Sequence, residues 1–173
     1  KCYSRSFIAS RRSVFRQMLR ESFPTPTELK GALLGTVLYL SLYLLGFIQF
    51  QSYSKICLYN KKKKEAKKND SNAKISWRQI KYYNSFDMLA LAGDRAVGNF
   101  VEFAIAFLPL MWLHAIFVDP TQSFVLCAIY NAARSLYPFL FLSKNTSVIL
   151  LSTAPGYLVL AYLSFQIVYI ALA

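Results

Sequence analysis

A run of 24 residues without a charge, from Gly31 to Ser54, is the feature that most limits what this chain can fold into. At ~1.5 Å per residue, a helix of that length exceeds the ~30 Å hydrocarbon core of a bilayer. The run follows Thr25-Pro26-Thr27-Glu28, a helix-start pattern with Thr as the N-cap, Pro at the first helical position and Glu two positions later. These residues predict a membrane span over about 31–54.

Three more apolar segments follow, and they predict spans over about 85–118, 121–142 and 147–172. The chain has 173 residues, of which 55% are hydrophobic and 16% aromatic, a composition typical of a multi-span membrane protein. The expected fold is therefore all-α: an integral membrane four-helix bundle over 25–173, preceded by a basic amphipathic extension over 1–24. Its first partner is the lipid bilayer.

The positive charge is concentrated in two blocks. The net charge is +12, and of the 20 lysines and arginines seven lie in residues 1–30 and ten between Lys55 and Lys81. The second block predicts a basic loop over 55–83 on the side of the membrane that collects positive charge. Nucleic acid is the competing partner for a basic chain, but the remaining sequence is too apolar to present a soluble binding face. We therefore expect no nucleic-acid partner.

The N-terminal block combines arginine and serine, and no acidic residue precedes Glu21. This composition resembles an organellar transit peptide. Its apolar residues Val14, Phe15, Met18 and Leu19 also recur at helical spacing, as in an amphipathic helix lying on a membrane surface. Both interpretations remain open. The expected location is a mitochondrial or plastid membrane, with the endoplasmic reticulum as the alternative.

Three cysteines and one histidine show no spacing typical of a metal site or a disulfide framework. The histidine, His114, lies on an apolar stretch, where packing is a commoner role than ligation. We expect no metal cofactor.

A polar stripe crosses the second span. Arg95, Asn99 and Glu102 are spaced at i, i+4 and i+7, which puts them on one face of a helix. Ionisable groups at membrane depth are costly and normally face protein. The spacing fits either a structural clamp between helices or a polar ligand site.

The third span carries a second stripe with the same spacing, formed by Tyr130, Arg134 and Tyr137. A very short turn at Asp119 makes the second and third spans antiparallel neighbours. If the two helices pack side by side, Arg134 is placed to pair with Glu102.

The sequence RAVGNFVE, from Arg95 to Glu102, resembles the RAxxNxxE core of the MAPEG family, the membrane-associated proteins in eicosanoid and glutathione metabolism. ARSLY, from Ala133 to Tyr137, resembles the family's second motif. The resemblance implies a four-helix protomer, usually assembled as a homotrimer, with glutathione bound between neighbouring subunits. It implies glutathione binding by Arg95, Asn99, Glu102 and Tyr130, and catalytic roles for Arg134 and Tyr137. Arginine suits the carboxylates of glutathione, and glutamate suits its ammonium group.

The residues that would stabilise the glutathione thiolate match the family less completely than the residues that would bind the peptide. Strongly active members carry another polar residue beside the asparagine, where this chain has Val97 and Gly98, and a later tyrosine of the second motif is Phe141. The arginines that stabilise the glutathione thiolate have only Lys55 and Lys144 as counterparts. Two functions stay open: a glutathione-dependent transferase or peroxidase acting on lipophilic substrates, or a non-catalytic accessory subunit bound to other membrane subunits in a large organellar complex.

Overall fold

The computed structural model describes residues 23–69, 75–82, 87–143 and 146–172. Nearly all of the N-terminal extension expected over 1–24 lies outside these residues. The described residues form helices and turns and no strand, and four of the helices are long and apolar enough to cross a membrane. The prediction of an all-α bundle with four spans is confirmed.

The first span is part of one continuous helix of 39 residues, Lys30–Lys68. It consists of α2 (Lys30–Ser41), the π-helical turn η1 (Leu42–Phe47) and α3 (Ile48–Lys68). The predicted capping pattern forms just before it: the amide of Thr25 donates to Glu28 Oε2 at 2.6 Å, and the amide of Glu28 donates to Thr25 Oγ1 at 3.4 Å. These two bonds satisfy amides that have no partner within a helix.

The structure corrects the expected basic loop over 55–83. Residues as far as Lys68 continue the first helix, and a short helix, α4 (Trp77–Tyr82), folds back against it. Lysine is a good helix former, so a lysine run continues a helix once packing holds one face of it. Leu58 lies on the packed face, where it contacts Ile80 of α4 and Ala90 of the next span. Lys61 adds an ion pair to Asp87 at 3.1 Å.

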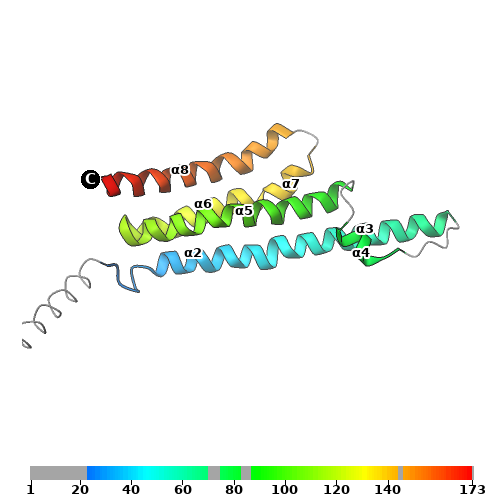
Figure 1. The fold of residues 1–173 in the computed structure, drawn as a ribbon, viewed down its shortest axis with the longest axis horizontal. Helices are drawn as coiled ribbons and strands as arrows, with labels where there is room; N and C mark the ends of the chain where they lie inside the picture. Colours follow the sequence, from blue (N-terminus) through cyan, green and yellow to red (C-terminus); the bar gives the residue numbers. More distant parts are fainter. Residues whose placement is uncertain (1–22, 70–74, 83–86, 144–145, 173) are drawn as a thin grey trace, which may run out of the picture.

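The other three spans complete the bundle (Figure 1). The second is α5 (Met88–Phe117), whose N-cap is Asp87: its carboxylate accepts bonds from the amides of Leu89 and Ala90. The third comprises η2 (Pro120–Gln122), α6 (Ser123–Ser135) and α7 (Tyr137–Phe141), and the fourth η3 (Thr146–Ile149) and α8 (Leu150–Leu172). The C-terminus lies at the same end of the bundle as the start of α2, and the lysine-rich end of α3 projects from the opposite end.

Stacked aromatic rings form the centre of the bundle. Tyr39 of α2 stacks on Phe100 of α5 at 4.2 Å between ring centroids, and Phe107 stacks on Tyr130 of α6 at 3.9 Å. All four side chains are buried. Many large apolar side chains on the outer faces are exposed in the protomer, as expected where a helix surface contacts acyl chains.

Asp119 caps the turn between the second and third spans. Its carboxylate accepts bonds from the Thr121 hydroxyl at 2.6 Å, the Thr121 amide at 2.8 Å and the Gln122 side-chain amide at 2.8 Å. These donors favour the charged form, so the pKa of Asp119 lies below its ordinary value, with Thr121 the largest cause.

We expect Asp119→Ala to lower the free energy of unfolding by about 0.5–2 kcal/mol, the usual loss for a capping side chain. Because the folded-state pKa is depressed, this contribution is complete above the ordinary carboxyl pKa of about 3.9 and is lost as the pH falls through the folded value. Thermal unfolding in detergent between pH 3 and 7 measures both effects. Asp119→Asn is the control, because it keeps cap acceptors but cannot titrate. An unchanged midpoint in Asp119→Ala would contradict the assignment.

Candidate functional site

Helix α5 carries the first polar stripe on a face that the protomer leaves partly uncovered. Arg95 and Glu102 are exposed and Asn99 is half-buried, whereas Ala96 and Phe100, on the adjoining face of the same turns, are fully buried. At ~1.5 Å per residue, Glu102 lies about 22 Å along the helix from its N-cap, well within the apolar span. A carboxylate at that depth needs a polar partner from outside the protomer, because contact with acyl chains is too costly.

The second stripe lies beneath the first. Tyr130, Arg134 and Tyr137 are all buried, with 0%, 1% and 6% of their surfaces exposed. The Tyr137 hydroxyl is close enough to interact electrostatically with Arg95, Asn99, Glu102 and Arg134. The structure therefore places Arg95, Asn99, Glu102 and Arg134 near Tyr137, with the Asn99 side chain within hydrogen-bonding reach of its hydroxyl, so five of the six predicted site residues lie near one another.

Aromatic rings surround the Arg134 guanidinium. Its Cζ lies 4.0 Å from the ring centroid of Phe103, 5.2 Å from that of Tyr130 and 6.0 Å from that of Tyr157. None of its three side-chain nitrogens has a hydrogen-bond partner among the described residues. The Tyr130 hydroxyl is near enough to interact with the charge but does not form a bond of normal geometry. Cation–π contact is thus the main favourable interaction of this buried cation.

A glycine of α8 makes room for that guanidinium. A Cβ atom built on Gly156 would lie 3.2 Å from Arg134 Nε and 3.4 Å from its Cζ. Helical spacing does not indicate which residue of another helix Gly156 contacts, so this role of Gly156 could not be predicted. The expected ion pair between Arg134 and Glu102 is wrong: neither residue forms an ion pair within the described chain.

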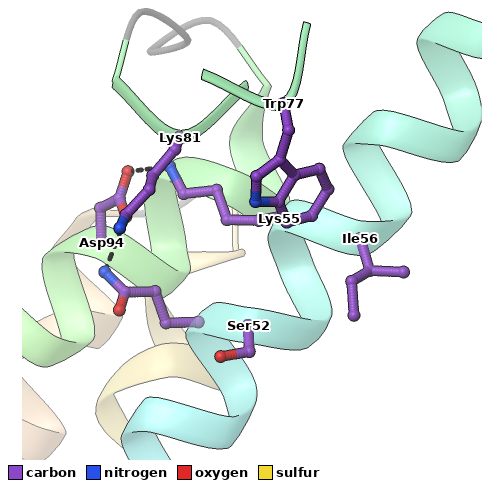
Figure 2. A pocket seen from close by; sticks show the side chains of 7 residues that line it. Ser52, Lys55, Ile56, Trp77, Lys81 and Asp94 are labelled. Atoms are coloured by element: carbon purple, nitrogen blue, oxygen red, sulfur yellow. Dashed lines mark hydrogen bonds and ion pairs between the residues drawn. The ribbon is translucent and has the colours of Figure 1, made fainter. Parts of the chain in front are cut away.

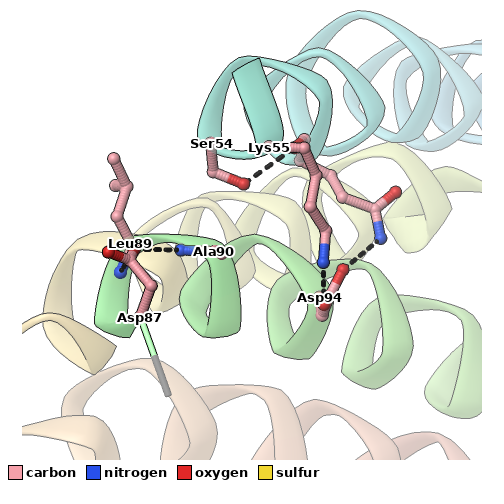
Figure 3. A network of polar contacts seen from close by, with 7 residues as sticks. Ser54, Lys55, Asp87, Leu89, Ala90 and Asp94 are labelled. Atoms are coloured by element: carbon pink, nitrogen blue, oxygen red, sulfur yellow. Dashed lines mark hydrogen bonds and ion pairs between the residues drawn. The ribbon is translucent and has the colours of Figure 1, made fainter. Parts of the chain in front are cut away.

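A polar cluster that was not predicted from the sequence lies at the end of the bundle from which α3 projects. A cavity of about 390 Å³ lies between α3, α4 and α5, and Figure 2 shows its lining. The lining residues are Gln51, Ser52, Lys55, Ile56, Trp77, Lys81 and Asp94. Lys55 Nζ forms an ion pair with Asp94 Oδ2, and the side-chain amide of Gln51 donates to Asp94 Oδ1 at 2.9 Å (Figures 2 and 3). Only the position of Lys55, directly after the charge-free run, hinted at this site.

A second, apolar cavity of about 160 Å³ lies beside the helix that carries Tyr137. Its lining comes from η1, α3, α6 and α7: Leu42, Gly46, Phe47, Phe50, Ser135, Pro138 and Phe139. Across the described residues, no group of three or more His, Cys, Asp or Glu side chains is placed to hold a metal ion. The chemistry available near Tyr137 is therefore that of a phenol, a guanidinium and the α5 stripe.

Four apolar helices, with charged residues gathered where two of them meet, define a multi-pass integral membrane protein with a polar site inside its spans. Comparison with family models matches residues 29–169 to the MAPEG family. The chain belongs to the MAPEG family. No match was found among curated proteins or among solved structures.

Proposed function

We propose that the protein is a glutathione-dependent transferase or peroxidase that acts on lipophilic substrates as a homotrimer, with glutathione bound between protomers. The observation that carries this proposal is the position of Tyr137, between the partly exposed stripe of α5 and the buried cation Arg134. An exposed stripe of arginine, asparagine and glutamate at membrane depth suits a ligand with carboxylates, amides and an ammonium group. Glutathione has all three.

In this proposal the two stripes have different roles. Arg95 and Asn99 hold the carboxylates and amides of the peptide, and Glu102 pairs with its ammonium group. Tyr130, which is fully buried, supports the site from beneath by packing its ring near the Arg134 guanidinium. The Tyr137 hydroxyl donates to the glutathione sulfur, and the positive charge of Arg134 lowers the pKa of that thiol, which favours the thiolate at neutral pH.

The thiolate would then react with a substrate arriving from the bilayer. In transfer, its sulfur bonds to an electrophilic carbon, and the leaving group departs with the displaced electron pair. In peroxide reduction, the sulfur bonds to one peroxide oxygen as the O–O bond breaks, and the departing alkoxide takes up the proton that the thiol lost and leaves as an alcohol. A second glutathione then attacks the resulting sulfenic acid, which forms the disulfide and releases water. The apolar cavity beside α7 offers a lipophilic substrate a place near Tyr137.

The second candidate is an accessory, non-catalytic subunit of an organellar membrane complex. One observation favours it: Phe103, Tyr130 and Tyr157 enclose the Arg134 guanidinium, so an anion reaches it only if a ring moves. In this case the uncovered α5 stripe would contact another membrane subunit in place of glutathione.

Glutathione binding by the purified full chain separates these functions. We expect calorimetry to detect binding, and Arg95→Ala and Glu102→Gln each to weaken it about 10- to 100-fold, the usual effect of losing a charge-assisted bond of about 1.5–3 kcal/mol. Arg78→Ala is the control, because Arg78 is an exposed arginine of α4 outside the stripe. Wild-type protein that binds no glutathione at millimolar concentration, and that conjugates no small electrophile, would exclude the enzyme.

A further inference from the structure

We propose that the cavity between α3, α4 and α5 binds the phosphate of an anionic lipid headgroup. It is a site separate from the Tyr137 cluster. Two lysines and one aspartate line it, so its lining carries one net positive charge. A cavity of about 390 Å³ has room for a glycerophosphate group, and basic pockets between membrane helices bind such headgroups.

The ion pair inside the cavity holds Lys55 in place without using all of its donors. The Lys55 side chain is 9% exposed, and Asp94 is fixed from both sides by Lys55 and Gln51 (Figure 3). An ammonium group has three N–H donors, and one bond to Asp94 leaves others to donate to a phosphate oxygen. Asp94 thereby orients the cation, while its own negative charge is neutralised.

Packing also determines the position of the second cation. Helix α4 is anchored by Ile80, which is fully buried against Leu58 and Ala90, and by an edge-on contact between Trp77 and Tyr59 at 5.2 Å. This anchoring brings Trp77 and Lys81 over the cavity, as Figure 2 shows. The site is thus built by three helices and is not a chance group of surface lysines.

The depth of the cavity favours a lipid over a soluble phosphate ester. Lys55 is the first charged residue after the 24-residue apolar run, so it marks the edge of the hydrocarbon core. Ile56 and Trp77 line the cavity and are each 48% exposed, and Tyr53, one turn deeper, is 61% exposed. A headgroup bound here would leave its acyl chains beside apolar side chains, and tryptophan is common at this level of a membrane.

Native mass spectrometry of the full chain in mixed micelles tests the proposal. With phosphatidylglycerol and phosphatidylcholine supplied together, we expect the wild type to retain phosphatidylglycerol preferentially. Lys81→Glu should weaken that retention about tenfold, because each lysine near an anionic headgroup makes a substantial electrostatic contribution. Lys63→Glu is the matched control: it makes the same charge change on an exposed lysine of α3 outside the cavity, and we expect less than a twofold change.

Several outcomes would overturn the inference. Equal retention of the two lipids, or equal losses in Lys81→Glu and Lys63→Glu, would show that the cavity does not select a headgroup. Displacement by millimolar glycerol 3-phosphate would assign the site to a soluble phosphate ester, and displacement by glutathione would make it part of the peptide site. If Lys81→Glu fails to fold, the double variant Lys55→Gln/Asp94→Asn, which keeps a neutral hydrogen-bonding pair, should show the same selective loss.

Discussion

Replacing Arg134 with methionine is expected to raise the thermal midpoint of the protein in detergent while abolishing glutathione turnover. The guanidinium is 1% exposed and lacks a hydrogen-bond partner among the described residues, so its burial is costly. Contact with Phe103 returns about 2 kcal/mol or somewhat more, which offsets only part of that cost. Replacing even paired buried ions by apolar residues of similar volume is often neutral or stabilises a protein by about 1–4 kcal/mol, and Arg134 has no such partner in the described chain. For a chain of this length that corresponds to roughly 2–4 °C per kcal/mol.

Arg134→Lys is the control for this prediction. It keeps a positive charge in the same aromatic surroundings, so we expect no gain in stability. Differential scanning fluorimetry measures the midpoints, and conjugation of a small electrophile measures turnover. A lower midpoint in Arg134→Met would mean that the charge has a strong partner in the assembled protein. The gain in stability does not depend on the proposed function, whereas the loss of turnover does.

Gly93→Ala is expected to separate α3 from α5 and to cost about 2 kcal/mol or more, even though alanine is the better helix former by about 1 kcal/mol. A Cβ atom at Gly93 would lie 2.5 Å from Ser54 Oγ and 3.0 Å from the Cα of Gln51. Ser54 is buried and already donates to the backbone of Gln51 at 2.7 Å, and a backbone atom cannot move alone. The two helices must therefore shift together.

Gly98, on the same helix, supplies the matched control. A Cβ atom there meets nothing within 4 Å inside the protomer, so Gly98→Ala should keep or slightly raise the midpoint of the detergent-solubilised protomer. Comparing the two thermal midpoints under identical conditions isolates the clash from the change in helix propensity. Equal midpoints would show that α3 and α5 do not approach as closely as the structure indicates.

The general form of the bundle followed from the sequence because a bilayer admits few alternatives. A charge-free run from Gly31 to Ser54 has to be a helix if it crosses lipid, since its backbone must satisfy its own hydrogen bonds. Helical periodicity likewise put Arg95, Asn99 and Glu102 on one face. These are local consequences of the chain and do not depend on which helices meet.

Contacts between helices could not be predicted from the sequence in the same way. Opposite charges suggested a pair between Arg134 and Glu102, but the space left by Gly156 and the rings around it hold Arg134 elsewhere. The lysine run looked like a solvated loop because Leu58, the buried residue just before it, has partners far along the chain. Both differences depend on side chains that are distant in sequence, and periodicity does not describe such contacts.

The unbroken first helix has an electrostatic consequence. Between Lys55 and Lys68 it rises about 20 Å, in the direction that α2 sets (Figure 1). Salt at physiological strength reduces the influence of a charge over about 8 Å. The next lysine, Lys61, lies about 9 Å beyond Lys55, close to that distance, and still contributes to the potential at the lipid surface, whereas Lys67 and Lys68 are about 18–20 Å out and do not. One continuous helix thus carries two groups of positive charge. At physiological ionic strength the charges nearer Lys55 act on the membrane surface, and those near Lys68 act only in the aqueous phase.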